Sequence, residues 1–189
     1  MTGHTHYLPA MGKHWMLFLY DPFTRLLGAG KVHGELLDRA AVQPGHRVLE
    51  IGCGTGNLLV ALGKRGVAVD AVGIDPDPAA LRRARRKTGN VRFEQAFAGE
   101  LPLPDASVDR VLSAFMLHHL DATEEARAMR EVHRVLRPGG ELHAVDLAVN
   151  DPGKLLGLMR DAGLTGPAEN GRGRRPGPLG SYVFYRASR

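Results

Sequence analysis

Cysteine and long apolar runs are nearly absent from this chain. One cysteine, Cys53, among 189 residues excludes an internal disulfide and a cysteine-cluster metal site, and we expect no bound metal. The longest apolar stretch near the amino terminus, residues 15–20, is far too short to span a bilayer, for which about 20 residues are needed. Because no charged segment leads into an apolar run and a small-residue cleavage site, we expect a cytoplasmic protein.

Lysine is also scarce, since 5 of the 25 basic residues are lysine and 20 are arginine. The formal net charge of +5 makes nucleic acid a partner to consider. The excess of arginine, with 24 glycines and 12 prolines, is more typical of a GC-rich genome than of selection for phosphate contacts. We interpret the densest basic run, residues 82–87, as a solvated helix face, with a nucleic-acid patch as the alternative.

Strand and helix patterns alternate from residue 47 onward. Strands are expected at residues 47–51, 68–75, 91–96, 107–114, 141–147 and 180–187. Helices are expected at residues 56–66, from 78 to about 88, 121–136 and 152–163, with Asp77 and Asp121 as N-caps. This alternation predicts an α/β fold in which helices cover both faces of a parallel sheet.

Two segments lie outside the alternation. Residues 1–40 are expected to form a helical extension, and residues 166–180, rich in glycine, proline and arginine, a mobile hairpin loop. We therefore treat residues 1–189 as a single domain with its core at 45–148 and a carboxyl-terminal helix and strand hairpin at 149–189.

The segment "VLEIGCGTGNL" at residues 48–58 predicts a ligand-binding loop after the first strand. Gly52, Gly54 and Gly56 follow the spacing G-x-G-x-G, whereas a dinucleotide site has G-x-G-x-x-G. Glu50 would repel a phosphate bound at this loop. The loop therefore suits a nucleoside ligand that lacks phosphates and carries positive charge.

S-adenosylmethionine has these properties, and "LEIGCGTG" resembles the first motif of the class I S-adenosylmethionine-dependent methyltransferases. Three further blocks resemble that family in the same order: residues 72–81, 100–120 and 130–142. The "LHHL" turn and residues 20–28 are similar to the small-molecule branch, which includes quinone-biosynthesis C-methyltransferases and phospholipid N-methyltransferases. The resemblance implies a Rossmann-like, doubly wound, mostly parallel sheet of seven strands with the last strand antiparallel.

The resemblance also implies where the cofactor, S-adenosyl-L-methionine, binds. Glu50 and the backbone of Gly52, Cys53 and Gly54 would hold the methionine end, and Gly56 would open the following helix. At the ends of the next strands, Asp75, followed by Pro76, would bind the ribose hydroxyls, Ala98 would lie near adenine, and Ser113 and Phe115 would border the methyl-transfer site. Phe97 stands where the family often has an acid that accepts the adenine amino group, so adenine is stacked or packed there, or Glu100 substitutes.

Substrate residues follow from position. His118 and His119 come after the fourth strand, where one of them would serve as a base; alternatively, both pack or cap the turn. Trp15, Phe18 and Tyr20, with Phe115, would form a lid over an apolar acceptor, or this segment caps the sheet.

We therefore predict a methyltransferase that acts on a small, apolar metabolite or lipid. A non-catalytic S-adenosylmethionine-binding protein and a nucleic-acid methyltransferase are the alternatives. Residues 113–116 read "SAFM" and not "NPPY", which argues against methylation of adenine or glutamine amino groups, and the one thiol argues against cysteine-dependent pyrimidine methylation. The oligomeric state is left open.

Overall fold

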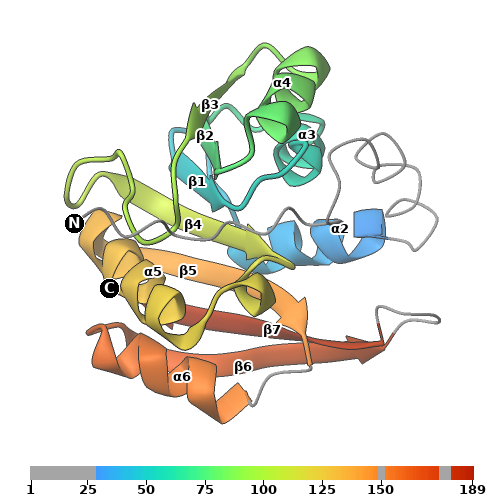
Figure 1. The fold of residues 1–189 in the computed structure, drawn as a ribbon. Helices are drawn as coiled ribbons and strands as arrows, with labels where there is room; N and C mark the ends of the chain where they lie inside the picture. Colours follow the sequence, from blue (N-terminus) through green and yellow to red (C-terminus); the bar gives the residue numbers. More distant parts are fainter. Residues whose placement is uncertain (1–28, 149–151, 175–179) are drawn as a thin grey trace.

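A seven-stranded sheet runs through the described part of the chain, which is residues 29–148, 152–174 and 180–189 of a computed structural model (Figure 1). Its strand order is β3-β2-β1-β4-β5-β7-β6. The strands are β1 (Arg47–Ile51), β2 (Asp70–Asp75), β3 (Val91–Gln95), β4 (Val108–Ala114), β5 (Leu136–Leu147), β6 (Thr165–Arg174) and β7 (Ser181–Ser188). β7 runs antiparallel to β5 and β6, while the other neighbours pair in parallel. The predicted Rossmann-like sheet, with its last strand antiparallel, is confirmed.

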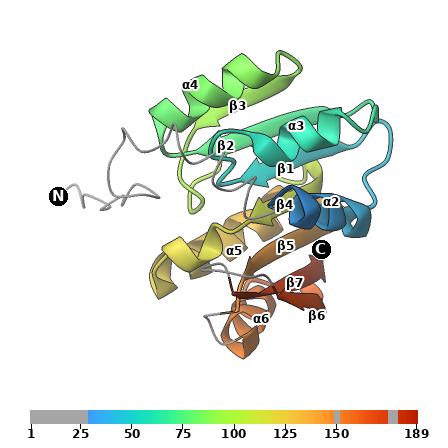
Figure 2. The same ribbon diagram turned by 90° about the vertical axis from the view of Figure 1, so that its right-hand side faces the viewer.

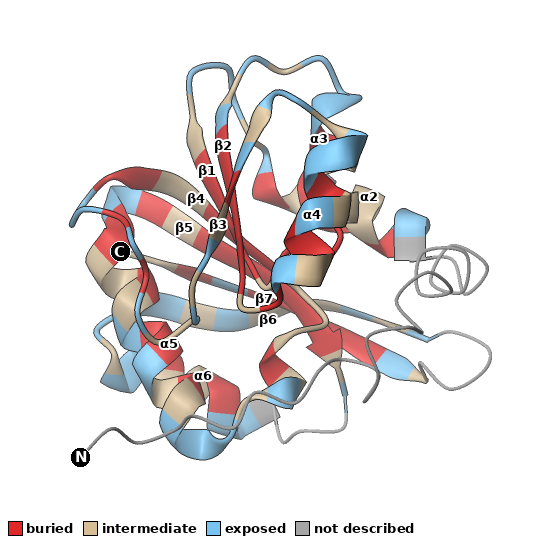
Figure 3. Cartoon of the chain, turned by 45° about the horizontal axis from the view of Figure 1, so that its top comes forward, coloured by how far each residue is buried: buried red, intermediate tan, exposed pale blue. Residues whose placement is uncertain are grey.

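Helices cover both faces of this sheet (Figure 2). Residues of α2, α3 and α4 share one apolar cluster with the sheet, and residues of α5 and α6 share another on the opposite face. The helices are α2 (Ala29–Ala40), α3 (Asn57–Gly63), α4 (Pro78–Lys87), η2 (Leu117–His119, a 3-10 turn), α5 (Ala122–Val135) and α6 (Pro152–Asp161). Figure 3 shows the buried residues concentrated in the central strands, as expected of a sheet covered on both sides.

Both predicted N-caps are present. The Asp77 carboxylate accepts the Ala79 amide at 2.7 Å, and Pro78 occupies the first turn of α4. The Asp121 carboxylate accepts the amides of Thr123 and Glu124 at 2.8 and 2.9 Å. Each cap satisfies amides that have no partner within the helix, a contribution of about 1 kcal/mol. These short side chains therefore fix where α4 and α5 begin.

The prediction of a loop at residues 166–180 is wrong for its first part, because residues 165–174 form the edge strand β6. Backbone pairing with β7 holds this strand, and the register shifts twice along it. Its glycines and exposed charged residues give no apolar alternation, so the side-chain pattern does not reveal it. Residues 175–179 and most of the predicted amino-terminal extension, residues 1–28, lie outside the described residues.

Several predicted boundaries also differ. The fifth strand is expected at residues 141–147, but β5 already begins at Leu136. α3 ends at Gly63, earlier than the predicted residue 66. Turn chemistry therefore located these elements to within a few residues, as is usual for boundaries.

An arginine fixes the connection between β3 and β4. The Arg134 guanidinium donates to the carbonyls of Leu101 and Leu103 at 3.0 and 2.7 Å and forms a two-pronged pair with Glu131. Glu131 in turn accepts the Leu101 amide at 2.7 Å. α5 thereby holds a segment without helix or strand close to the sheet, because these charge-assisted bonds satisfy its backbone.

One buried histidine lies in the middle of β5, away from the strand ends. His143 is 1% exposed, and its Nε2 pairs with Glu141 at 3.1 Å, while its Nδ1 has no hydrogen-bond partner. Burial lowers the pKa of His143 below its usual range, against the opposing effect of Glu141. The folded protein therefore binds a proton at His143 less readily than the unfolded chain does.

This difference predicts an acid-sensitive stability. As pH falls through about 6.5, the usual value for histidine, the unfolded chain gains a proton at this position that the folded protein does not gain, so the free energy of unfolding decreases. His143→Gln, which retains a donor toward Glu141, should reduce this loss between pH 7.5 and 5.5 in urea unfolding. His46→Gln, in a loop, is the matched control and should leave the pH dependence unchanged. Parallel curves for wild type and His143→Gln would contradict the assignment.

Candidate cofactor and acceptor site

The predicted glycine loop connects β1 to α3 at the point where the strand order reverses, between β1 and β4. In open parallel sheets this is where ligands bind. The amides of Gly52 and Cys53 both donate to the Ile74 carbonyl, at 2.8 and 2.9 Å. The loop is therefore tied to the end of β2.

The three loop glycines all have left-handed φ values, 69°, 50° and 78° for Gly52, Gly54 and Gly56. Their surroundings differ. A Cβ on Gly52 would lie 2.2 Å from Cγ of Met116, and one on Gly56 would lie 3.0 Å from the Ala84 Cβ. In the part of the chain that the structure describes, a Cβ on Gly54 would meet nothing within 4 Å. Packing thus accounts for Gly52 and Gly56, while Gly54 borders the open space of the site.

Two carboxylates lie beneath this loop. Glu50 at the end of β1 is 3% exposed, and its buried Oε2 has no hydrogen-bond partner among the described residues. Burial raises the pKa of Glu50 well above its usual value, and the nearby charge of Asp75 raises it further, against a hydrogen bond from the Leu59 amide. Glu50 is therefore an acid that lacks a compensating positive charge, a costly state for a buried group.

Asp75 has more partners than Glu50. One carboxylate oxygen accepts the Gly54 amide at 2.8 Å and the other accepts the Asp77 amide at 2.9 Å. Burial nevertheless raises the pKa of Asp75, because desolvation outweighs the two amide bonds. Since a carboxylate has about four acceptor positions, the two amides leave room for ribose hydroxyls, and they also fix the orientation of the group.

Cys53 is a packing residue in this structure. The thiol is buried, and burial raises its pKa above the usual range, with the neighbouring charges of Glu50 and Asp75 acting in the same direction. A thiol in such surroundings stays protonated, so it is a poor nucleophile. The prediction that the Cys53 side chain has no nucleophilic role agrees with these surroundings.

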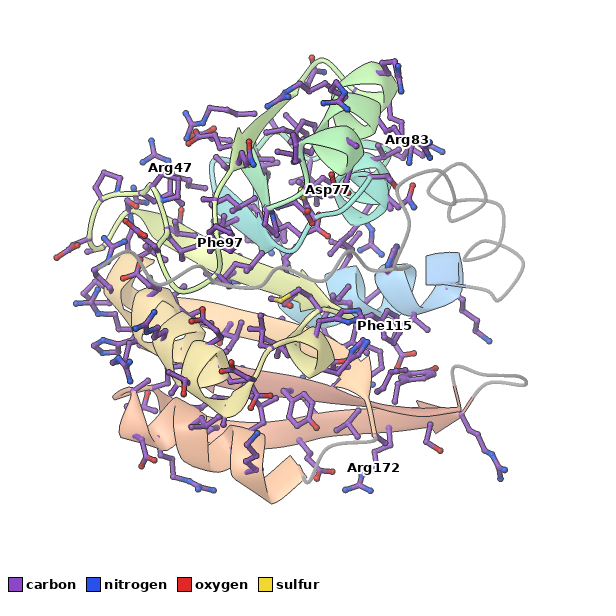
Figure 4. The ribbon with its side chains drawn as sticks, in the orientation of Figure 1. Arg47, Asp77, Arg83, Phe97, Phe115 and Arg172 are labelled. Carbon is purple, nitrogen blue, oxygen red and sulfur yellow. The ribbon has the colours of Figure 1, made fainter. Side chains whose placement is uncertain are left out.

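The residues expected beside adenine follow β2 and β3. The Gln95 side chain donates to the Pro76 carbonyl at 3.0 Å and so joins the two strand ends. Phe97 is 43% exposed, while Ala98 packs against the core. Figure 4 shows Phe97 and Asp77 beyond the ends of these neighbouring strands. An exposed phenyl ring at this place can stack on a base, as one of the predicted alternatives requires.

The segment after β4 carries the residues expected beside the acceptor. Ser113 is buried in β4 and its Oγ has no partner. Phe115 takes a left-handed φ of 55°, its amide donates to the Val145 carbonyl at 2.8 Å, and its ring meets Tyr182 edge-on at 6.4 Å. A phenylalanine with positive φ is uncommon and marks a backbone fixed by its surroundings. Phe115 was predicted here, whereas Tyr182 was not.

The two candidate histidines occupy different environments in η2. His118 Nδ1 lies 2.5 Å from a carboxylate oxygen of Asp146, and the His118 backbone amide donates to the other oxygen at 3.0 Å. The His119 ring lies 4.0 Å from that of His118, and burial, followed by the charge of His118, lowers the pKa of His119. Sequence analysis missed Asp146, although one signal was present: an acid within the short apolar segment "AVDL" at the end of the fifth strand.

Not every predicted site residue can be placed. Trp15, Phe18 and Tyr20 lie outside the described residues, so the lid stays a prediction. Within residues 29–148, 152–174 and 180–189, no three His, Cys, Asp or Glu side chains are arranged to hold a metal ion. None of the helices in the same ranges is both long and apolar enough to cross a membrane.

The fold and the loop define a class before any relative is considered: a doubly wound α/β domain with two buried carboxylates at the glycine loop, where ligands of this fold bind. Residues 48–140 match the family model described as a methyltransferase domain. The chain therefore carries a methyltransferase domain of the class I, S-adenosylmethionine-dependent family, and the predicted resemblance is confirmed.

The similar proteins agree with this assignment. The chain is 38% identical over 130 residues to the demethylmenaquinone methyltransferase of Deinococcus radiodurans, which covers 65% of this chain and 53% of that protein. It is 35% identical over 155 residues to a ubiquinone/menaquinone biosynthesis C-methyltransferase of Vibrio vulnificus. That match covers 74% of this chain and 57% of the Vibrio protein. The chain thus spans about half the length of the curated relatives it matches. A SAM-dependent methyltransferase from Aquifex aeolicus shares the fold, with a TM-score of 0.74 at 22% identity over 94% of this chain and 99% of that one.

S-adenosylmethionine is the cofactor that this family implies, and the residues present fit it. The unpartnered Oε2 of Glu50 requires a cation or a hydrogen-bond donor. Gly54 leaves open space at the loop. When bound, S-adenosylmethionine supplies an activated methyl group and the positive charge that the buried carboxylates lack.

Glu50→Gln should therefore separate stability from binding. Glutamine removes a carboxylate that is costly to ionise, and that cost is present above about pH 4.5 and grows toward the raised pKa of the folded protein. At pH 7.5 the free energy of unfolding without ligand should stay equal or increase, while the affinity for S-adenosylmethionine should fall by about 1.5–3 kcal/mol. Calorimetry and urea unfolding measure the two quantities, and a destabilised variant with unchanged affinity would refute the role assigned to Glu50.

Gly54→Ala tests the open space at the loop. The new methyl group points to where the ligand should lie, so affinity for S-adenosylhomocysteine should fall at least tenfold in calorimetry. The left-handed backbone adds a strain of about 1 kcal/mol. Gly66→Ala is the matched control, because Gly66 has φ 68° and open surroundings at the far end of α3. Equal affinity in both variants would mean that the ligand does not approach Gly54.

Proposed function

We propose that this protein transfers the methyl group of S-adenosylmethionine to a small, apolar acceptor, and that the acceptor carries an aromatic or quinol ring. The observation that carries the proposal concerns Glu50 and Gly54: within the described residues, the buried Oε2 of Glu50 has no hydrogen-bond partner, and Gly54 of the same loop region has open surroundings. A neutral or anionic nucleotide would leave this acid uncompensated, whereas a sulfonium and an ammonium group compensate it.

The side chains at the acceptor end support a ring-shaped substrate. Phe115 and Tyr182 meet edge-on, and Tyr182 meets Phe184 in the same way at 5.6 Å. Tyr182 and Phe184 are buried and support the Phe115 ring from behind. Phe115 is partly exposed at the end of β4, so it is the ring that an aromatic acceptor would meet edge-on or offset. The names of two similar proteins, a demethylmenaquinone methyltransferase and a ubiquinone/menaquinone biosynthesis C-methyltransferase, indicate that those proteins act on such rings.

The protein's part in the reaction is alignment. Methyl transfer requires the acceptor atom in line with the bond that breaks, and holding two reactants in this geometry accounts for much of the rate gain. Glu50 and Asp75 would fix the donor on one side, while the segment from Phe115 to His119 would fix the acceptor on the other. The cytoplasmic location remains part of this proposal.

Binding and turnover should be measured together. Calorimetry should show binding of S-adenosylmethionine, and transfer of a labelled methyl group should be assayed with a reduced prenylated quinone, ethanolamine phospholipid vesicles and RNA. We expect transfer to the quinol alone. No binding to the folded protein would overturn the proposal, binding without any transfer would indicate a non-catalytic binding protein, and transfer to RNA with a steep salt dependence would indicate a nucleic-acid enzyme.

A further inference from the structure

The histidine and the carboxylate that meet at the ends of β4 and β5 form a constrained pair. Asp146 is 3% exposed at the carboxyl end of β5. One of its oxygens contacts His118 Nδ1 at 2.5 Å and accepts the Leu147 amide at 2.7 Å, while the other accepts the His118 amide at 3.0 Å. The carboxylate thus fixes both the ring and the backbone of His118, so the ring cannot turn without losing a buried bond.

These contacts set the tautomer of His118. A carboxylate accepts hydrogen bonds, so the ring proton belongs on Nδ1 and the lone pair on Nε2. Within the described residues, Nε2 makes no hydrogen bond, and the side chain retains 17% exposure. His118 therefore presents a proton acceptor to its surroundings, and the positive charge formed when it takes a proton faces Asp146.

His119 provides a comparison within the same turn. Within the described residues, His119 forms no hydrogen bond with Asp146, and it is exposed where His118 is partly buried. Asp146 from β5 and His119 from η2 are the titratable groups that contact His118 in the described part of the chain. The sequence does not distinguish the two adjacent histidines. In the structure, it is His118 whose ring orientation and tautomer are fixed by a carboxylate, as a base requires.

The pair lies close to the cofactor loop along the chain. Met116, two residues before His118, places its Cβ and Cγ over the Cα of Gly52. The η2 turn therefore begins where the acceptor segment packs on the glycine loop. A base at this place would stand beside the atom that receives the methyl group.

We propose that His118 Nε2 takes a proton from the methyl acceptor, that Asp146 is the positioning residue for this base, and that the acceptor belongs to the class that must lose a proton: a phenol, a hydroquinone or another hydroxyl compound. The proposal rests on the proposed function. In the step, the bond from the methyl carbon to the acceptor forms as its bond to sulfur breaks, the sulfonium becomes a neutral thioether, and the acceptor's proton passes to Nε2 and then to solvent. A tertiary amine or a thioether acceptor would have no proton to give.

The tautomer can be tested in the full-length protein without any cofactor. Long-range ¹⁵N–¹H correlation spectra distinguish Nδ1–H from Nε2–H rings, and loss of one signal in His118→Gln identifies the residue. We expect Nδ1–H for His118 in the wild type and a mixture of tautomers in Asp146→Asn. An Nε2–H ring in the wild type would overturn the proposal, whether or not the protein proves to be a methyltransferase.

Kinetics then test the base. His118→Gln should lower kcat about 10²–10⁴-fold, the usual scale of general base catalysis, with the affinity for S-adenosylmethionine within twofold of wild type. His46→Gln, in the loop before β1 and so at the opposite end of the strand from the site, is the control and should retain kcat within about threefold. Asp146→Asn should lower kcat less than His118→Gln, because it removes the group that orients the base and leaves the base itself in place.

An acceptor that is already ionised separates a base from a merely structural residue. With a nitro-substituted phenol at pH 8.5, which has lost its proton in solution, His118→Gln should approach the wild-type kcat. An equal loss with ionised and neutral acceptors would overturn the proposal, as would an unchanged kcat with the neutral one. A wild-type protein that does not bind S-adenosylmethionine would instead count against the proposed function.

Discussion

The buried pair of Glu50 and Asp75 is the constraint on which the site depends. The two acids lie at the ends of neighbouring strands. Burial raises the pKa of each, and the charge of Asp75 raises the pKa of Glu50 further. Two carboxylates in one low-dielectric site destabilise an empty protein. The surrounding backbone offsets part of this cost, because Gly54 and Asp77 donate their amides to Asp75. The negative charge of an ionised Glu50 is not compensated in this way, and a cationic ligand would supply the opposite charge.

The glycine loop connects the two halves of the site. Gly56 lets α4 and β3 approach the start of α3, Gly52 lets Met116 approach from the segment after β4, and Gly54 alone of the three faces open space. One loop of five residues therefore sets the distance between the donor side and the acceptor side. The same Met116 segment leads directly into η2, so a shift of the loop would be transmitted to His118 through packed side chains.

Local patterns in the sequence predicted the elements that local interactions determine. Asp77 and Asp121 predicted the helix starts because a short acidic side chain can accept the unpaired amides of the first helical turn. β6 was not predicted, because backbone pairing with β7, and not side-chain burial, holds its glycines and arginines in place. Asp146 and His118 are 28 residues apart in sequence and meet only through the register of β4 with β5. Without that register, His118 and His119 were equivalent, and no local signal distinguished them.

Sheet register also explains why Asp146 lies apart from the coupled pair of Glu50 and Asp75. Glu50 lies in register with Gly73 and Leu112, and Leu112 with His143, so Glu50 faces the side that α3 and α4 cover, as Asp75 does two residues beyond Gly73. Asp146, three residues after His143, faces the opposite side with Ala144. The sheet thus separates the carboxylates that would hold a cationic donor from the carboxylate that would orient a base. A fold with these groups on one face would bring three buried acids together and raise every pKa, whereas alternation along the strands permits both chemistries at one edge.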